Sequence, residues 1–145
     1  MIVDCNLVVS WQTRPRGFVA LMGLYESNYL RLAGLAGDLR ALPGTVESNV
    51  ADDCTLVLSV LERSRYTSEV LLTYLLPHLV QPKGAAFERV PDLRLRLYHD
   101  ARLLEASSGH CSGAERELDR RWTRNIMVNK WLEYCAERGH SFAPN

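Results

Sequence analysis

Residues 93–100 read Leu-Arg-Leu-Arg-Leu-Tyr-His-Asp, and this stretch decides the fold class. Leucine alternates with arginine and tyrosine, so one side of the segment is apolar and the other is polar. A period of two is typical of a strand in an antiparallel sheet that is covered on one face only. His99-Asp100 then predicts a hairpin turn, and Ala101–Ser107 is expected to return as the partner strand.

Further strands are predicted upstream of this hairpin. Apolar residues alternate over Cys54–Glu62, and Tyr66–Leu76 follows as a second strand after a short turn. Thr45–Ala51 is expected to add one more strand. The prolines and the glycine from Pro77 to Pro91 predict a loop between Tyr66–Leu76 and the last hairpin.

Two helices are predicted on either side of the strands. From Phe18 to Leu42 apolar residues recur at spacings of three and four, and Pro43-Gly44 predicts the end of this helix. Its apolar stripe comprises Phe18, Leu21, Met22, Tyr25, Tyr29, Leu32, Ala36 and Leu39, with Ala20, Ser27, Arg31, Gly34 and Asp38 opposite.

The C-terminal helix is predicted to begin after a capping box at Ser112–Glu115 and to end at Gly139. Its apolar face comprises Leu118, Trp122, Ile126, Trp131, Leu132 and Cys135. We therefore predict an α+β fold, in which an antiparallel sheet of four to five strands carries an N-terminal and a C-terminal long helix on one face.

Length and charge limit the domain organisation and the partners. A chain of 145 residues, 47% of them apolar, fits one domain, which we expect over residues 17–145, with 1–16 as a loosely attached extension. The 17 basic and 17 acidic residues give a net charge of zero, which argues against a nucleic-acid binder. Two copies of the chain would also not repel each other over long distances, so a homodimer meets no electrostatic barrier. No signal peptide and no apolar run of about 20 residues is present, so we expect a cytoplasmic protein without membrane association.

The cysteines and glycines predict neither a metal site nor a cofactor. Cys5, Cys54, Cys111 and Cys135 are scattered without a C-x-x-C pair, so we expect four free thiols in a reducing compartment. The chain also contains no Gly-x-Gly-x-x-Gly and no Walker pattern for phosphate binding.

Four segments carry a family resemblance when they are taken in order. They are Glu26-x-Asn28-Tyr29-x-x-Leu32, Glu62-x-Ser64-x-Tyr66-Thr67, Leu95-Arg96-Leu97-Tyr98-His99-Asp100-Ala101 with Glu105 shortly after, and the set Asn125, Trp131-Leu132, Cys135 and Gly139-His140. With these the chain resembles domain-of-unknown-function family 1249 over roughly residues 17 to 140. The resemblance implies a cytoplasmic bacterial protein with the α+β layout, and no reaction is assigned to the family. Where family members usually carry a tyrosine- and proline-rich segment followed by an Asp-Glu pair, this chain has the shorter stretch Gly109–Arg124.

The hairpin holds the sharpest cluster of candidate catalytic residues. His99 could act as a general acid or base, with Asp100 setting its tautomer and Glu62 or Glu105 on the same sheet. The alternative is a structural turn, in which Asp100 accepts backbone N–H bonds and Tyr98 packs across the strand pair. Adjacent residues on a strand point to opposite faces, which favours the structural interpretation.

Other polar residues have structural and functional interpretations. Glu62 continues the apolar series of its strand, so we expect it at the rim of the core, where Arg96 or Tyr66 would be its partner. Asn28 and Asn125 flank the two apolar stripes, and we expect them to satisfy backbone groups across the helix interface, with a ligand contact as the alternative.

Four arginines occupy the first half of the last helix and could face phosphate groups. Acidic residues are interleaved with Arg116, Arg120, Arg121 and Arg124, and this mixture favours a solvated helix face with i,i+4 pairs.

Two classes of function are compatible with these residues. A non-catalytic binding or regulatory module would use the exposed sheet face around Arg94, Arg96 and Tyr98 to hold a protein or small-molecule partner, or to form a homodimer. A small enzyme would act on a phosphorylated or acyl substrate through Tyr98, His99, Asp100 and Glu62. Convergence of Glu62, Tyr98 and His99 in one pocket would favour the enzyme, and their separation would favour the binding module.

Overall fold

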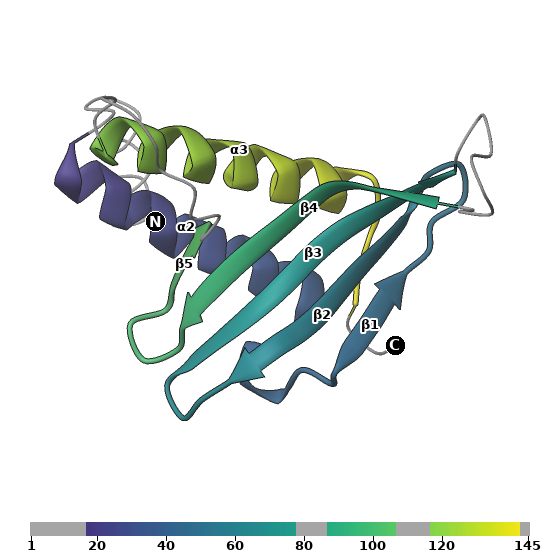
Figure 1. Cartoon of the computed structure of the whole chain (residues 1–145), viewed down its shortest axis with the longest axis horizontal. Helices are drawn as coiled ribbons and strands as arrows, with labels where there is room; N and C mark the ends of the chain where they lie inside the picture. The colour runs from purple at the N-terminus through teal and green to yellow at the C-terminus, as the bar shows by residue number, and fades with distance from the viewer. Residues whose placement is uncertain (1–16, 78–86, 107–116, 143–145) are drawn as a thin grey trace.

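The computed structural model describes residues 17–77, 87–106 and 117–142. Helices α2 (Phe18–Ala36) and α3 (Glu117–Glu137) lie side by side over one face of a five-stranded antiparallel sheet (Figure 1). The strands neighbour one another in chain order: β1 (Thr45–Ser48), β2 (Thr55–Arg63), β3 (Thr67–Pro77), β4 (Phe87–Tyr98) and β5 (Leu103–Ala106). The predicted α+β arrangement is therefore confirmed.

The core lies between the sheet and the two helices. Alternate residues of the central strands face it, and their register places Leu58 opposite Leu72 and Leu97 opposite Leu104. The alternation in residues 93–97 thus separates a buried face from a solvated one. Side chains that are at most 2% exposed in this core are Leu32, Leu35, Leu39, Leu56, Leu58, Val70, Leu72, Leu95, Leu97, Leu104, Val128, Leu132 and Cys135.

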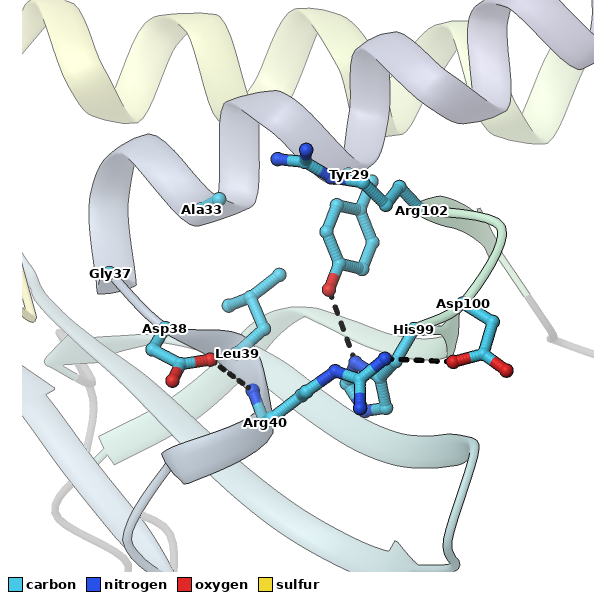
Figure 2. Close-up of a pocket in the computed structure, with 9 residues that line it drawn as sticks. All are labelled: Tyr29, Ala33, Gly37, Asp38, Leu39, Arg40, His99, Asp100 and Arg102. Carbon is cyan, nitrogen blue, oxygen red and sulfur yellow. Dashed lines mark hydrogen bonds and ion pairs between the residues drawn. The ribbon is translucent and has the colours of Figure 1, made fainter.

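Helix α2 ends at Ala36, so the prediction of a helix to Leu42 is wrong. Gly37 has φ = 77°, a left-handed value that favours glycine, and its amide donates to the Ala33 carbonyl at 2.8 Å. A short 3-10 helix, η1 (Leu39–Ala41), follows and is capped by the Asp38 carboxylate, which accepts from the Arg40 amide at 3.0 Å. Because the helix ends at Ala36, the chain changes direction and η1 lies beside the turn between β4 and β5 (Figure 2).

The buried arc of α2 also differs from the predicted stripe. Phe18 is 69% exposed at the start of the helix, whereas Ala20, expected on the opposite side, is buried. Ala20 packs in a second apolar cluster with Leu24, Tyr25 and Trp122 of α3. Because both the sheet and α3 cover α2, the buried part of the helix is wider than a single stripe.

Irregular pairing explains two strand predictions that are wrong. Pro91 lies inside β4 and not in a loop, at a place where the register jumps from Thr73–Asp92 to Leu75–Arg89. Such irregularities accommodate a proline, which has no N–H to donate. In β2 the register shifts between Val60 and Glu62, and one extra residue reverses the alternation. Glu62 is therefore exposed on the outer face and not at the core rim.

Some sequence predictions fall outside the described residues. These are the extension 1–16, the capping box Ser112–Glu115, and the thiols of Cys5 and Cys111. Within the described part of the chain, Cys54 and Cys135 are free cysteines. In the same part, none of the helices combines the length and the apolar character that crossing a membrane requires.

Candidate functional site

The β4–β5 hairpin sends His99 into the protein and Tyr98 to the outer face of the sheet. The His99 ring is buried between α2 and β3, and its Nδ1 is 3.1 Å from the Tyr29 hydroxyl (Figure 2). Its Nε2 is 2.9 Å from the Ser68 hydroxyl. Burial, together with the positive charge of Arg40, lowers the pKa of His99 below its ordinary value. The imidazole is thus a neutral group with both nitrogens engaged.

Asp100 points away from His99 at the surface. Its Oδ1 accepts a hydrogen bond from Arg40 Nη2 of η1 at 2.8 Å, and both side chains are more than half exposed. The hydrogen-bonding partner of His99 Nδ1 is the Tyr29 hydroxyl. The carboxylate–histidine arrangement that an acid–base site would use is therefore replaced here by an arginine–aspartate pair at the turn.

A cavity of about 440 Å³ lies beside this hairpin and is called here the hairpin pocket. It opens between the C-terminal end of α2, η1 and the β4–β5 turn (Figure 2). Its lining residues are Tyr29, Ala33, Gly37, Asp38, Leu39, Arg40, His99, Asp100 and Arg102.

A second hollow, of about 230 Å³, lies at the β2–β3–β4 end of the sheet and is called here the outer-sheet groove. Glu62 stands opposite Glu69, and Glu69 stands opposite Arg96, so three charged side chains follow one row across the strands. Arg96 Nη2 is 3.8 Å from Glu69 Oε1. The residues that line the groove are Glu62, Ser64, Thr67, Ser68, Glu69, Arg96 and Tyr98.

Three further binding candidates, Tyr66, Arg94 and Glu105, lie at the β2–β3 turn, on β4 and on β5 but do not line the groove. Tyr98 donates to Glu105 Oε1 of β5 at 2.8 Å, which fixes the tyrosine across the strand pair. Tyr66 is half exposed at the β2–β3 turn, and the Arg65 guanidinium lies 5.2 Å from the centre of its ring. Arg94 is exposed two residues before Arg96, on the same side of β4. The carboxylate that Arg96 approaches is thus Glu69 and not the expected Glu62.

The two candidate asparagines meet in the helix interface. Asn125 Oδ1 accepts from the Ala106 amide at 2.8 Å, and its Nδ2 donates to the Arg121 carbonyl at 2.7 Å. Asn28 Nδ2 donates to the Asn125 carbonyl at 3.4 Å, while its Oδ1 accepts from Asn129 Nδ2 at 2.9 Å. All three amides are at most 1% exposed. This network joins α2, α3 and β5, and its amides are hydrogen-bonded within the protein, as expected for buried polar groups.

A buried polar cluster that the sequence does not predict fixes the segment after α3; we call it the tail clasp. His140 Nδ1 is 2.9 Å from Ser48 Oγ, and His140 Nε2 is 2.9 Å from Asp53 Oδ2. Tyr74 donates to the same Asp53 oxygen at 2.6 Å, and Arg138 Nε donates to it at 3.3 Å. The tail clasp therefore joins β1, the β1–β2 loop and β3 to the C-terminal segment.

Electrostatics identify the Asp53 carboxylate as the centre of the tail clasp. Burial pushes the pKa of Asp53 upward, but hydrogen bonds from Tyr74, the Cys54 amide, His140 and Arg138 outweigh it and hold the pKa well below the usual range. The carboxylate also acts on Tyr74, whose pKa is raised by burial and by its hydrogen bond to Asp53. The ionised form of Asp53 is thus strongly favoured in the fold.

Ser48, His140 and Asp53 are hydrogen-bonded in the order serine, histidine, aspartate, as in the catalytic triad of a hydrolase, but the serine of the tail clasp is not accessible as a nucleophile. The His140 side chain is fully buried, Ser48 is 4% exposed, and the Ser48 oxygen already accepts from the Ser141 amide at 3.0 Å. Its chemistry is that of a satisfied structural network. Tyr74 and His140 come from segments far from Ser48 and Asp53 in the sequence, so no local spacing signals the cluster.

Comparisons with known proteins place the chain in a family. The family described as "Protein of unknown function (DUF1249)" matches residues 31–141. The "Uncharacterized protein YqiB" of Escherichia coli strain K12 is 26% identical over 138 residues, which cover 88% of this chain and 94% of the relative. The protein of the same name from Escherichia coli O157:H7 matches equally. No solved structure matches significantly. The chain therefore belongs to the DUF1249 family, as the Leu-Tyr-His-Asp-Ala hairpin indicated.

Proposed function

We propose that this protein is a non-catalytic binding module and that the outer-sheet groove is its contact site. One observation carries the proposal: Glu62 and Tyr98 line the same open groove, while His99 lies on the opposite face with both ring nitrogens engaged. An acid–base catalyst must reach the proton that it transfers. The enzyme alternative would need these three side chains in one cleft, so it has less support.

The charges in the groove favour a cationic contact group. Glu62 and Glu69 stand directly opposite each other, an arrangement that like charges make unfavourable in a sheet. Arg96 approaches Glu69, whereas within the described residues no ion pair or hydrogen bond engages the Glu62 carboxylate. An ammonium or guanidinium group from a partner would compensate this carboxylate, and the neighbouring Tyr98 ring would provide an aromatic contact.

The proposal includes a bacterial cytoplasmic setting. The relatives that match are bacterial proteins. Cys54 and Cys135 are free cysteines, which suits a reducing compartment. An exposed lysine or arginine of another protein, of a second copy of this chain, or of a small amine would supply the cationic group.

Amide NMR titration with agmatine, which carries both a guanidinium and an amine, tests the groove. We expect saturable shifts at the amides of residues 62–69 and 96–98, and their loss in Glu62→Gln. Glu47→Gln is the matched control, because Glu47 is an exposed carboxylate on β1 outside the groove. Absence of saturable shifts, or shifts that Glu62→Gln leaves unchanged, would contradict the proposal.

A further inference from the structure

We propose that the hairpin pocket is a second ligand site and that it binds the phosphate group of a small phosphorylated molecule through Arg40 and Arg102. The hairpin pocket and the outer-sheet groove have no lining residue in common. The inference therefore stands on observations separate from those that support the binding groove.

The pocket has the size and the charges that such a ligand needs. Its volume of about 440 Å³ falls within the range of small-molecule sites. Arg40 enters from η1 and Arg102 from the β4–β5 turn, so the two guanidinium groups come from different elements of the pocket wall (Figure 2). Arginine is the residue best suited to phosphate, because its planar fork of donors matches the phosphate oxygens.

Arg102 lines the pocket, and within the described residues no hydrogen bond or ion pair engages its guanidinium group. Its backbone has φ = 57°, a left-handed value that a residue with a side chain adopts at a cost. Its guanidinium lies 6.0 Å from the centre of the Tyr29 ring, within reach of a cation–π contact. Among the described residues, none forms a salt bridge with Arg102.

Two carboxylates also line the pocket, and both are already engaged. Asp38 accepts from the Arg40 amide at 3.0 Å, and Asp100 accepts from the Arg40 guanidinium at 2.8 Å. The Arg40–Asp100 pair is exposed, and exposed ion pairs are weak, so a dianionic phosphate can replace Asp100 at Arg40. A phosphate monoester has three terminal oxygens and two negative charges, whereas a carboxylate has two oxygens and one negative charge, so phosphate can accept more hydrogen bonds from the guanidinium groups of the pocket. The arrangement therefore favours phosphate over carboxylate.

Tyr29 and His99 form a neutral wall of the pocket. Burial lowers the pKa of His99 and raises the pKa of Tyr29, so neither group adds charge near neutral pH. Their hydrogen bond of 3.1 Å fixes both rings. Tyr29 and His99 thus form a fixed, uncharged part of the pocket wall, and the positive charge of the pocket comes from the two arginines.

Isothermal titration calorimetry on the full chain tests the site, with inorganic phosphate, glucose 6-phosphate and succinate as probes. We expect saturable binding of both phosphates, weakened about tenfold or more in Arg102→Gln and in Arg40→Gln. Arg102→Lys should keep part of the affinity, because lysine keeps the charge without the fork of donors. Arg65→Gln is the control, since Arg65 is an exposed arginine that contacts Tyr66 outside the pocket.

Three outcomes would overturn the inference. They are the absence of saturable phosphate binding, an unchanged affinity in Arg102→Gln, and tighter binding of succinate than of phosphate. Thermal melts verify that each variant is folded. Glu62→Gln should leave phosphate binding unchanged, because Glu62 belongs to the outer-sheet groove, so failure of one site can be told from failure of the other.

Discussion

The His99 imidazole lies between two hydroxyl groups in the interior, and this environment links its protonation to stability. Burial lowers the pKa of His99 in the folded state, whereas the unfolded chain binds a proton near the ordinary value of about 6.5. Below that pH the unfolded state binds more protons than the folded state. The free energy of unfolding must therefore fall as the pH falls from about 7 toward the pKa of the folded state.

His99→Gln should flatten this pH dependence. We expect the variant to be less stable at about pH 7.5 by about 1–3 kcal/mol, because glutamine cannot satisfy both hydroxyl groups. Between about pH 7.5 and about pH 5.5 it should lose less stability than the wild type. Urea unfolding at the two pH values measures the difference, and His140 is present in both proteins. Equal losses would show that His99 is not held neutral.

Asp53 also loses its stabilising contribution as the pH falls, but at lower pH than His99, because the hydrogen bonds to its carboxylate lower its pKa in the folded state. Its contribution is present above its ordinary pKa of about 3.9 and is lost as the pH falls through the lower value of the folded state. Asp53→Asn should cost about 2–3 kcal/mol near neutral pH, since several donors lose a charged acceptor. Denaturant unfolding measures this cost.

Hydrogen exchange provides a local readout of the same variant. The Phe142 amide donates to the Leu35 carbonyl at 2.7 Å, and it should lose protection when the tail clasp is broken. Asp52→Asn is the control, because Asp52 has φ = 64°, which asparagine tolerates, and its carbonyl is the group that Arg138 contacts. A similar loss of protection in Asp52→Asn would contradict the role given to the Asp53 carboxylate.

At the scale of elements, α2 depends on packing more than on its own sequence. Gly17 at its N-cap supplies no side-chain hydrogen bond, its first turn has no acidic residue, and its last turn has no basic residue. Nothing in these positions complements the helix dipole. Tertiary contacts along the Leu24, Tyr25 and Leu32 side must therefore stabilise the helix.

Leu32→Ala tests this dependence. Leu32 is fully buried in the core between α2 and the sheet, so its truncation should cost about 2–5 kcal/mol of unfolding free energy. Leu30→Ala is the matched control on the same helix, where a half-exposed leucine should cost less than about 0.5 kcal/mol. Chemical denaturation of both variants measures the two losses. A cost for Leu32→Ala as small as that of its control would be incompatible with this packing.

At the scale of the whole molecule, the two helices cover one face of the sheet (Figure 1). The row of Glu62, Glu69 and Arg96 lies on the other face. The outer-sheet groove and the hairpin pocket are consequently built from different surfaces. Cys135 lies in the core between α3 and the sheet, where burial and the charge of Asp53 raise the pKa of its thiol to about 12. Cys54 is only half-buried beside the same core.

The two thiols should therefore differ in reactivity. With iodoacetamide under native conditions, Cys54 should be alkylated while Cys135 remains a thiol, because the thiolate is the reactive form and Cys135 is both buried and protonated. Peptide mass spectrometry after timed labelling measures each site, and labelling in urea is the control. Equal rates at Cys135 in native and denatured protein would mean that this part of the core is open.

The sequence by itself determined the elements and their layers, because periodicity is a local property. Alternation at Leu93, Leu95 and Leu97, and spacings of three and four between Leu21 and Leu32, require strands and helices that bury one face. Gly37 was also a local signal for the early end of α2.

Only the tertiary structure decided which polar groups meet. The register shift after Val60 turns Glu62 outward, and the path of the chain after Gly37 brings Arg40 to Asp100. The tail clasp joins Asp53 to His140 from segments 87 residues apart. These contacts depend on strand pairing and on chain direction over long distances, and neither is encoded in the spacing of neighbouring residues.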